Sequence, residues 1–189
     1  MNLLKTTLAT VLVSALSLPA VAEVDPNVAQ SRMVVKDFFK TLKGELVGAM
    51  KAGGPVNAIN VCNKRAMMIA VDKSMTHNIR VARTSLKLRN PVNAPDEWEE
   101  KVLNDFEKRK AAGESPKKIE YSEVVTNKFG KQQFRYMKAI PMGKPCMACH
   151  AEKIKPEVEA RLKELYPADK ARGFKPGDIR GAFTITKDL

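Results

Sequence analysis

The chain has 189 residues, of which 44% are hydrophobic and 29% are charged. This composition is typical of a globular protein, with too many apolar residues for a disordered chain and too few for a multi-span membrane protein. Lys and Arg number 33 against 21 Asp and Glu, and the three cysteines are too few for a disulfide-stapled scaffold. A chain of this length predicts a single domain.

The first 22 residues have the pattern of an export signal. Residues 1–5 carry a positive charge, residues 8–18 are mostly apolar, and Ala20-Val21-Ala22 has the A-x-A form of a cleavage site. The apolar segment is shorter than the ~20 residues that a bilayer span needs. We therefore expect cleavage after Ala22, a mature domain of residues 23–189 without a membrane span, and a periplasmic location. The alternative is an uncleaved N-terminal anchor.

Export restricts the partners that the basic composition suggests. The formal net charge of the chain is +12, and the mature chain keeps almost all of it. Nucleic acid is not the expected partner of an exported protein. The charge then predicts either a solvated basic surface or attraction to acidic partners and to an anionic cofactor.

Two helices are predicted at the start of the mature chain. Asp25-Pro26 suits a helix N-terminus, and residues 28–51 carry an apolar stripe at helical spacing. Gly53-Gly54 ends this helix, and a second is predicted over residues 55–75. In the second helix Cys62 lies in register with the apolar Ile59, so the cysteine is predicted to point inward.

The rest of the chain alternates strands and helices. The pattern predicts a helix at 96–112, a short helix at 156–166, and strands at 78–85, 118–126, 131–140 and 177–186. Residues 127–130 form a hairpin turn between the two middle strands. Loops are expected at 86–95 and after Pro141. Helices followed by mixed strands and helices with hairpin-style connections predict an α+β fold with an antiparallel sheet.

The segment Cys146-Met147-Ala148-Cys149-His150 is a C-x-x-C-H motif, which is typical of covalent haem attachment. The two thiols add across the haem vinyl groups as thioethers, and the adjacent His150 reaches the iron. There are three alternatives. They are a thioredoxin-like motif, a Cys146–Cys149 disulfide, and a zinc site in which Cys62 and either His150 or His77 join the two motif cysteines. A thioredoxin-like motif needs a strand–motif–helix context, whereas we expect this motif in a loop. Export favours haem, because this attachment is made outside the cytoplasm.

Cys62 has no cysteine to pair with if both motif cysteines form thioethers. It is then either a buried, inert thiol or the second axial ligand of the iron, as a thiolate. His77 and several of the nine methionines compete for that role, and Met or His ligation is commoner in electron-transfer cytochromes. Arg65, one helical turn from Cys62, is a candidate to lower the pKa of its thiol.

Four segments together resemble the Tll0287-like group of haem-binding domains, first labelled as a domain of unknown function. They are Ala58-Ile59-Asn60-Val61-Cys62, the run RTSLKLRNPVNAPDEWE at 83–99, the C-x-x-C-H motif, and GDIRGAFT at 177–184. The resemblance implies a PAS-like fold, with an antiparallel sheet and flanking helices, that carries one covalent haem c. It also implies that His150 and Cys62 are the two axial ligands, and it points to redox or gas sensing.

Three arginines are candidates to bind the haem propionates, namely Arg80, Arg83 and Arg89. Arg83 is favoured because it shares its strand face with apolar residues. If the bond between the iron and Cys62 weakened on reduction or protonation, NO or CO could take that side of the iron.

The expected function is that of an exported mono-haem c-type cytochrome in one-electron transfer or in haem-based redox or gas sensing. Two strong protein ligands argue against an enzyme, because an enzyme needs an open iron position. The alternatives are a haem reductase or peroxidase with a labile sixth ligand, and a zinc or disulfide module without haem. The expected partner is a separate redox or signalling protein, acidic in character.

Overall fold

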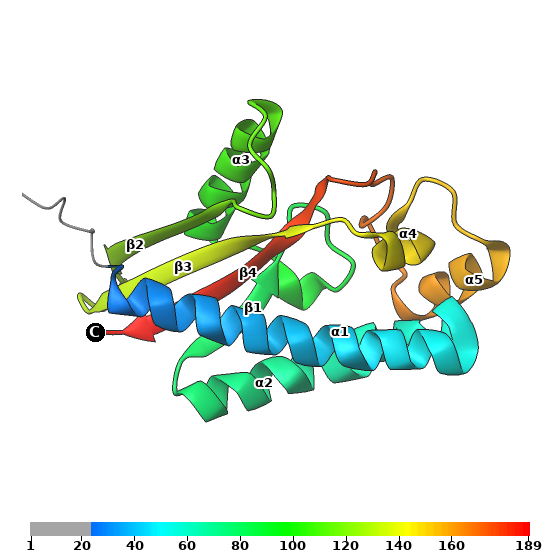
Figure 1. Cartoon of the computed structure of the whole chain (residues 1–189), viewed down its shortest axis with the longest axis horizontal. Coiled ribbons are helices and arrows are strands. Elements are labelled where there is room, and N and C mark those ends of the chain that lie inside the picture. Colours follow the sequence, from blue (N-terminus) through cyan, green and yellow to red (C-terminus); the bar gives the residue numbers. More distant parts are fainter. Residues whose placement is uncertain (1–23) are drawn as a thin grey trace, which may run out of the picture.

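The computed structural model describes residues 24–189 and forms an α+β fold (Figure 1). The predicted export signal lies outside these residues. One antiparallel sheet has the strand order β1-β4-β3-β2. The strands are β1 (Arg80–Thr84), β2 (Glu120–Thr126), β3 (Gln132–Pro141) and β4 (Ile179–Asp188). The predicted fold class, an antiparallel sheet with flanking helices behind an N-terminal helical region, is confirmed.

The N-terminal helical region is one long helix with a break, followed by a second helix. Helix α1 (Pro26–Asn60) begins at Asp25, whose side chain accepts a hydrogen bond from Asn27 N at 2.7 Å. Gly53 and Gly54 have non-helical backbone angles, so the break predicted there is confirmed as a kink within α1. The chain then passes through a π-helical turn, η1 (Val61–Arg65), into α2 (Ala66–His77). No sequence pattern predicted η1, which carries Cys62.

The two faces of the sheet bury separate apolar clusters. One face packs against α1 and α2 through Phe38, Ile69, Tyr136 and Phe183, with the Phe38 and Phe183 rings 5.3 Å apart. The other face packs against α3 (Glu97–Ala111) through residues that include Phe106. Alternation along β3 and β4 sends neighbouring side chains to opposite faces, which is why one sheet serves both clusters.

The α3 helix begins with a capping box, in which Asp96 and Glu99 bond each other's backbone N–H groups. The preceding loop contains a single 3₁₀ turn, η2 (Pro91–Asn93). The hairpin turn predicted at 127–130 is confirmed, with Asn127 N bonded to Lys131 O at 2.8 Å. None of the helices within residues 24–189 combines the length and apolar character that crossing a bilayer requires.

The expectation that the C-x-x-C-H motif lies in a loop is wrong. The motif lies on a short helix, α4 (Lys144–His150), and is followed by α5 (Pro156–Leu165). Gly143 and Pro145 predicted a loop, but Gly143 is the N-cap and Pro145 lies in the first turn, where a missing N–H costs nothing. Figure 1 shows α4 and α5 together at one end of the sheet, beside the C-terminal part of α1.

Candidate functional site

The segments that carry the predicted site residues meet at this end of the sheet. They are α4, η1, the ends of β1 and β4, and the loop at 166–178 that links α5 to β4. All three cysteines are free thiols and half-buried. Cys149 packs beside a cluster formed by α1 and α5, which includes Ile59 and Leu162. Cys146 packs beside a second cluster, which includes Met142 and Phe174. The two motif thiols therefore lie against different apolar clusters.

His150 forms a hydrogen bond to the backbone through one ring nitrogen, Nδ1, whereas the other, Nε2, has no backbone partner. Its Nδ1 lies 2.8 Å from Ala171 O, and a carbonyl can only accept, so Nδ1 carries the proton. Burial, together with the charges of Arg180 and Arg89, lowers the pKa of His150 well below its ordinary value. The ring is therefore neutral, with a lone pair on Nε2. This is the form in which histidine binds a metal.

Cys62 lies near the C-x-x-C-H motif, and its thiol interacts electrostatically with those of Cys146 and Cys149. Burial raises the pKa of the Cys62 thiol, while the charges of Arg83, Arg89 and Arg180 act in the opposite direction. Burial likewise raises the pKa of Cys149 to about 11. The expectation that Arg65 lowers the pKa of Cys62 is wrong. Arg65 is bound to Glu45 at 2.8 Å on the outer surface, because the wide η1 turn and α2 direct it there.

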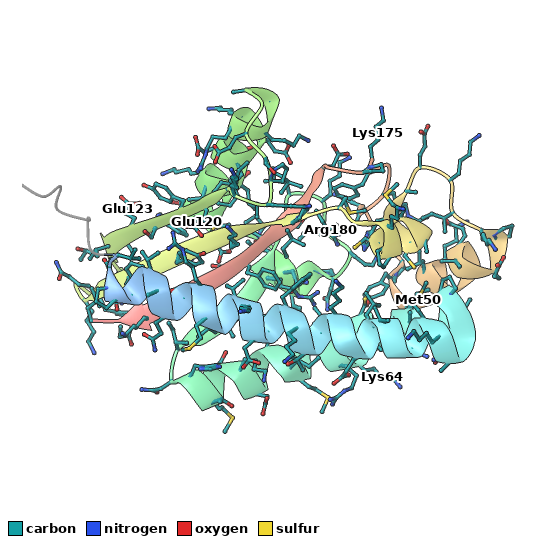
Figure 2. All side chains as sticks on the ribbon, viewed as in Figure 1. Met50, Lys64, Glu120, Glu123, Lys175 and Arg180 are labelled. Carbon is teal, nitrogen blue, oxygen red and sulfur yellow. The ribbon has the colours of Figure 1, made fainter. Side chains whose placement is uncertain are left out.

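Three guanidinium groups surround the His150 and Cys62 side chains. Arg89 Nη1 and Arg180 Nε each lie 3.5 Å from His150 Nε2. Burial and the charges of Arg89 and Arg83 lower the pKa of Arg180 to about 10, and burial also lowers that of Arg83. Figure 2 shows Arg180 on β4, toward the end of the sheet that carries α4.

The charge balance of this cluster fits an anionic group. Arg89 is paired with the carboxylate of Asp169 at 3.1 Å. Neither Arg83 nor Arg180 forms a salt bridge with a carboxylate anywhere in residues 24–189, although burial disfavours the charge on both. An anion in contact with these two groups would offset that cost. The two carboxylates of a haem supply such an anion, so the residues present fit the predicted cofactor.

Some of the predicted residues lie away from this cluster. Arg80 is exposed and pairs in register with Thr186, whereas Arg180 lies at the opposite end of β4. Arg80 therefore lies away from the arginine cluster at His150 and is not placed to bind the haem propionates. His77 is bound to Asp37, 3.0 Å away, between α2 and α1. Within the described part of the chain, no group of three or more His, Cys, Asp or Glu side chains is arranged to hold a metal ion, so a four-ligand zinc site is not formed.

Three further residues at the cluster were missed from the sequence. Arg180 is the second residue of β4, and a charged side chain near a strand end is normally read as facing solvent. Asp169 lies in a loop without a recognisable motif, and the buried Tyr166 comes directly before Pro167. No local pattern in the sequence points to any of the three, because each is brought to the site by the return of the loop at 166–178.

Comparison with known proteins gives a family and a fold. The model of the Tll0287-like family, described as Tll0287, matches residues 13–187. The solved structure titled as the crystal structure of the cyanobacterial heme-protein Tll0287 is similar, with a TM-score of 0.67 and 21% sequence identity. The match covers 88% of this chain and 98% of that chain, and it shows a shared fold. No curated protein matches the chain.

Proposed function

The chain belongs to the Tll0287-like family, and from this premise we propose that it is a haem-binding protein with one covalent haem c. Cys146 and Cys149 would hold the haem as thioethers. His150 Nε2 and the Cys62 thiolate would be the axial ligands on the two sides of the iron. Arg83 and Arg180 would bind the propionates, so Arg180 takes the place that the sequence suggested for Arg80.

One observation carries this proposal. Three thiols lie near a neutral histidine whose Nε2 bears a lone pair. Two half-buried arginines, Arg83 and Arg180, which have no carboxylate partner among residues 24–189, reach the same place from β1 and β4. The placement of Cys62 in a π-helical turn supports a special role for it, since such turns occur frequently at functional sites. A zinc or disulfide module would have no use for two half-buried arginines without carboxylate partners among residues 24–189.

Haem supplies a one-electron iron couple, and the protein sets its ligands and surroundings. Two protein ligands would leave no open position on the iron, which favours electron transfer or sensing over catalysis. His150 would be tethered beside the iron by the neighbouring thioethers, whereas Cys62 is held only by its own helical segment, η1. Release of Cys62 would therefore be the route by which NO or CO reaches the iron. We place the protein in the periplasm, with an acidic redox or signalling protein as its partner.

The test is production of the mature chain in a host that carries the haem-attachment machinery, followed by intact-mass measurement and a pyridine haemochrome assay. We expect one haem per chain with two thioether bonds. The double variant Cys146→Ser/Cys149→Ser is the control and should lack covalent haem. A colourless wild-type chain with the mass of the bare polypeptide would overturn the proposal.

Addition of CO to the ferrous protein separates a shuttle from a sensor. A shuttle keeps both ligands in both oxidation states, so its ferrous absorption spectrum should not change with CO. A sensor exchanges Cys62 for CO, and its spectrum should change. A haem enzyme would instead have a labile or absent sixth ligand, which the absorption spectrum of the ferric protein would reveal before any gas is added.

A further inference from the structure

Arg89 joins two backbone segments that meet at His150. Its side chain is only 7% exposed. Its Nη2 donates a hydrogen bond to Cys149 O in the motif helix and another, 3.2 Å long, to Ala171 O in the loop that follows α5. Arg89, in the loop after β1, therefore binds both Cys149 O, which directly precedes His150, and Ala171 O, which accepts the hydrogen bond of the His150 ring.

Asp169 completes this connection from the other side. Its side chain is 2% exposed, and its Oδ2 lies 3.1 Å from Arg89 Nη2, at an ion-pair distance. Its Oδ1 accepts a hydrogen bond from Ala171 N at 2.9 Å. Asp169 thus fixes both the guanidinium and the peptide that presents Ala171 O.

Ala171 O is the point at which these contacts reach the histidine. This oxygen accepts hydrogen bonds from Arg89 Nη2 and, at 2.8 Å, from His150 Nδ1. The two bonds use both lone pairs of the carbonyl oxygen. Phe174 N also donates to His150 O at 3.0 Å, so the loop is bound to the end of α4 by its backbone as well. A hydrogen bond from the second ring nitrogen sets the tautomer and ring orientation of a ligating histidine.

We propose that the buried Arg89–Asp169 pair is a positioning device for His150. It holds Ala171 O against Nδ1, keeps the proton on that nitrogen, and directs Nε2 toward the haem face. Its role toward iron rests on the proposed function, whereas its role toward the ring and the loop does not. Of the three arginines, only Arg89 would act on the Nδ1 side of His150, whereas Arg83 and Arg180 would be left to bind the propionates.

The chain contains only two histidines, which makes the test direct. The mature chain is labelled with ¹⁵N-histidine, and long-range ¹H–¹⁵N NMR spectra are recorded for the ferrous holoprotein and for the same chain before haem attachment. We expect a single Nδ1–H form of His150 in the wild type. Arg89→Gln and Asp169→Asn should each lose that single form, and the Nδ1 proton should exchange faster with solvent. His77, bound to Asp37, is the internal reference and should not change.

Arg180→Gln is the matched control, because Arg180 and Arg89 both approach Nε2 at 3.5 Å but only Arg89 also binds Ala171 O, the acceptor of Nδ1. It should change the reduction potential of the holoprotein and leave the Nδ1–H signal intact. Should Arg89→Gln fail to fold, Arg89→Met/Asp169→Leu removes both charges together, which cores often tolerate. A wild-type His150 signal and exchange rate in Asp169→Asn and in either Arg89 variant would overturn the proposal. An absent haem would instead overturn the proposed function, and the spectra of the haem-free chain would still test the pair.

Discussion

Cys62 is the axial-ligand candidate that no thioether ties to the motif helix. Cys62→Ser should therefore keep its covalent haem through Cys146 and Cys149 but lose sulfur ligation. We expect the ferric electron paramagnetic resonance and visible spectra to change to those of a haem without a thiolate ligand. His77→Gln is the control, since His77 is bound to Asp37 between α2 and α1, and its spectra should match the wild type. Unchanged spectra in Cys62→Ser would show that Cys62 is not a ligand.

The residues that were predicted from the sequence share a local signal. Cys146, Cys149 and His150 are recognisable because thioether formation and iron ligation constrain their spacing over five residues. Arg83, which lies near Cys62, was a candidate because it interrupts an apolar strand face. Arg180 and Asp169 carry no such signal, since their roles depend on which loops meet in space. Arg80 was misassigned for the same reason, because strand position alone does not say which end of the sheet faces the motif.

The kink in α1 depends on a backbone conformation that only glycine adopts readily. Gly54 has φ +68°, and seven residues further on the chain enters η1. Gly54→Ala should lower the free energy of unfolding by about 1–3 kcal/mol through backbone strain. Gly48→Ala is the matched control within α1, where an added Cβ meets no atom within 4 Å and should stabilise the helix by up to about 1 kcal/mol. Both values are measured by urea unfolding, and equal stability of the two variants would contradict this account of the kink.

Helix and strand positions followed from periodicity, but the form of two helical segments did not. The break at Gly53-Gly54 was predicted because paired glycines disfavour a helix. The π-helical turn that holds Cys62 has the same apolar spacing as an ordinary helix over so few residues. In α4, glycine and proline were read as loop residues although both suit the start of a helix. Short segments give too few residues for periodicity to decide.

Glu120 joins three elements and stabilises the whole molecule. It accepts hydrogen bonds from Arg32 of α1 at 2.9 Å, from Tyr136 of β3 at 2.7 Å and from Lys138 at 3.2 Å. Figure 2 shows Glu120 on β2 near the N-terminal half of α1. Burial alone would raise the pKa of Glu120, but the bonds from Arg32 and Tyr136 and the charge of Lys138 lower it to about 2.

The lowered pKa predicts a pH-dependent contribution to stability. The stabilisation is complete above the ordinary pKa of 4.5 and is lost as the pH falls toward about 2. Glu120→Gln should therefore be less stable than the wild type at neutral pH, by roughly 2 kcal/mol. The difference should shrink below pH 4.5. Thermal unfolding across this range measures it, with the exposed Glu157→Gln as control, and a difference that did not depend on pH would contradict the assignment.

The α+β class of the whole molecule was predictable, whereas its strand order was not. Alternating strands and the hairpin turn at 127–130 are local patterns. The pairing of β1 with β4, the first strand with the last, joins segments about 100 residues apart. Gly181 marks this pairing, because a Cβ there would lie 2.3 Å from Thr84 O, but the sequence alone does not identify its neighbour.

X-ray absorption spectroscopy at the iron edge of the ferric holoprotein tests the central claim most directly, because it counts the sulfur atoms bound to iron. We expect one sulfur neighbour from Cys62 on η1, with the porphyrin nitrogens and His150 on α4 supplying the rest. An iron shell of nitrogen and oxygen atoms without sulfur would contradict it.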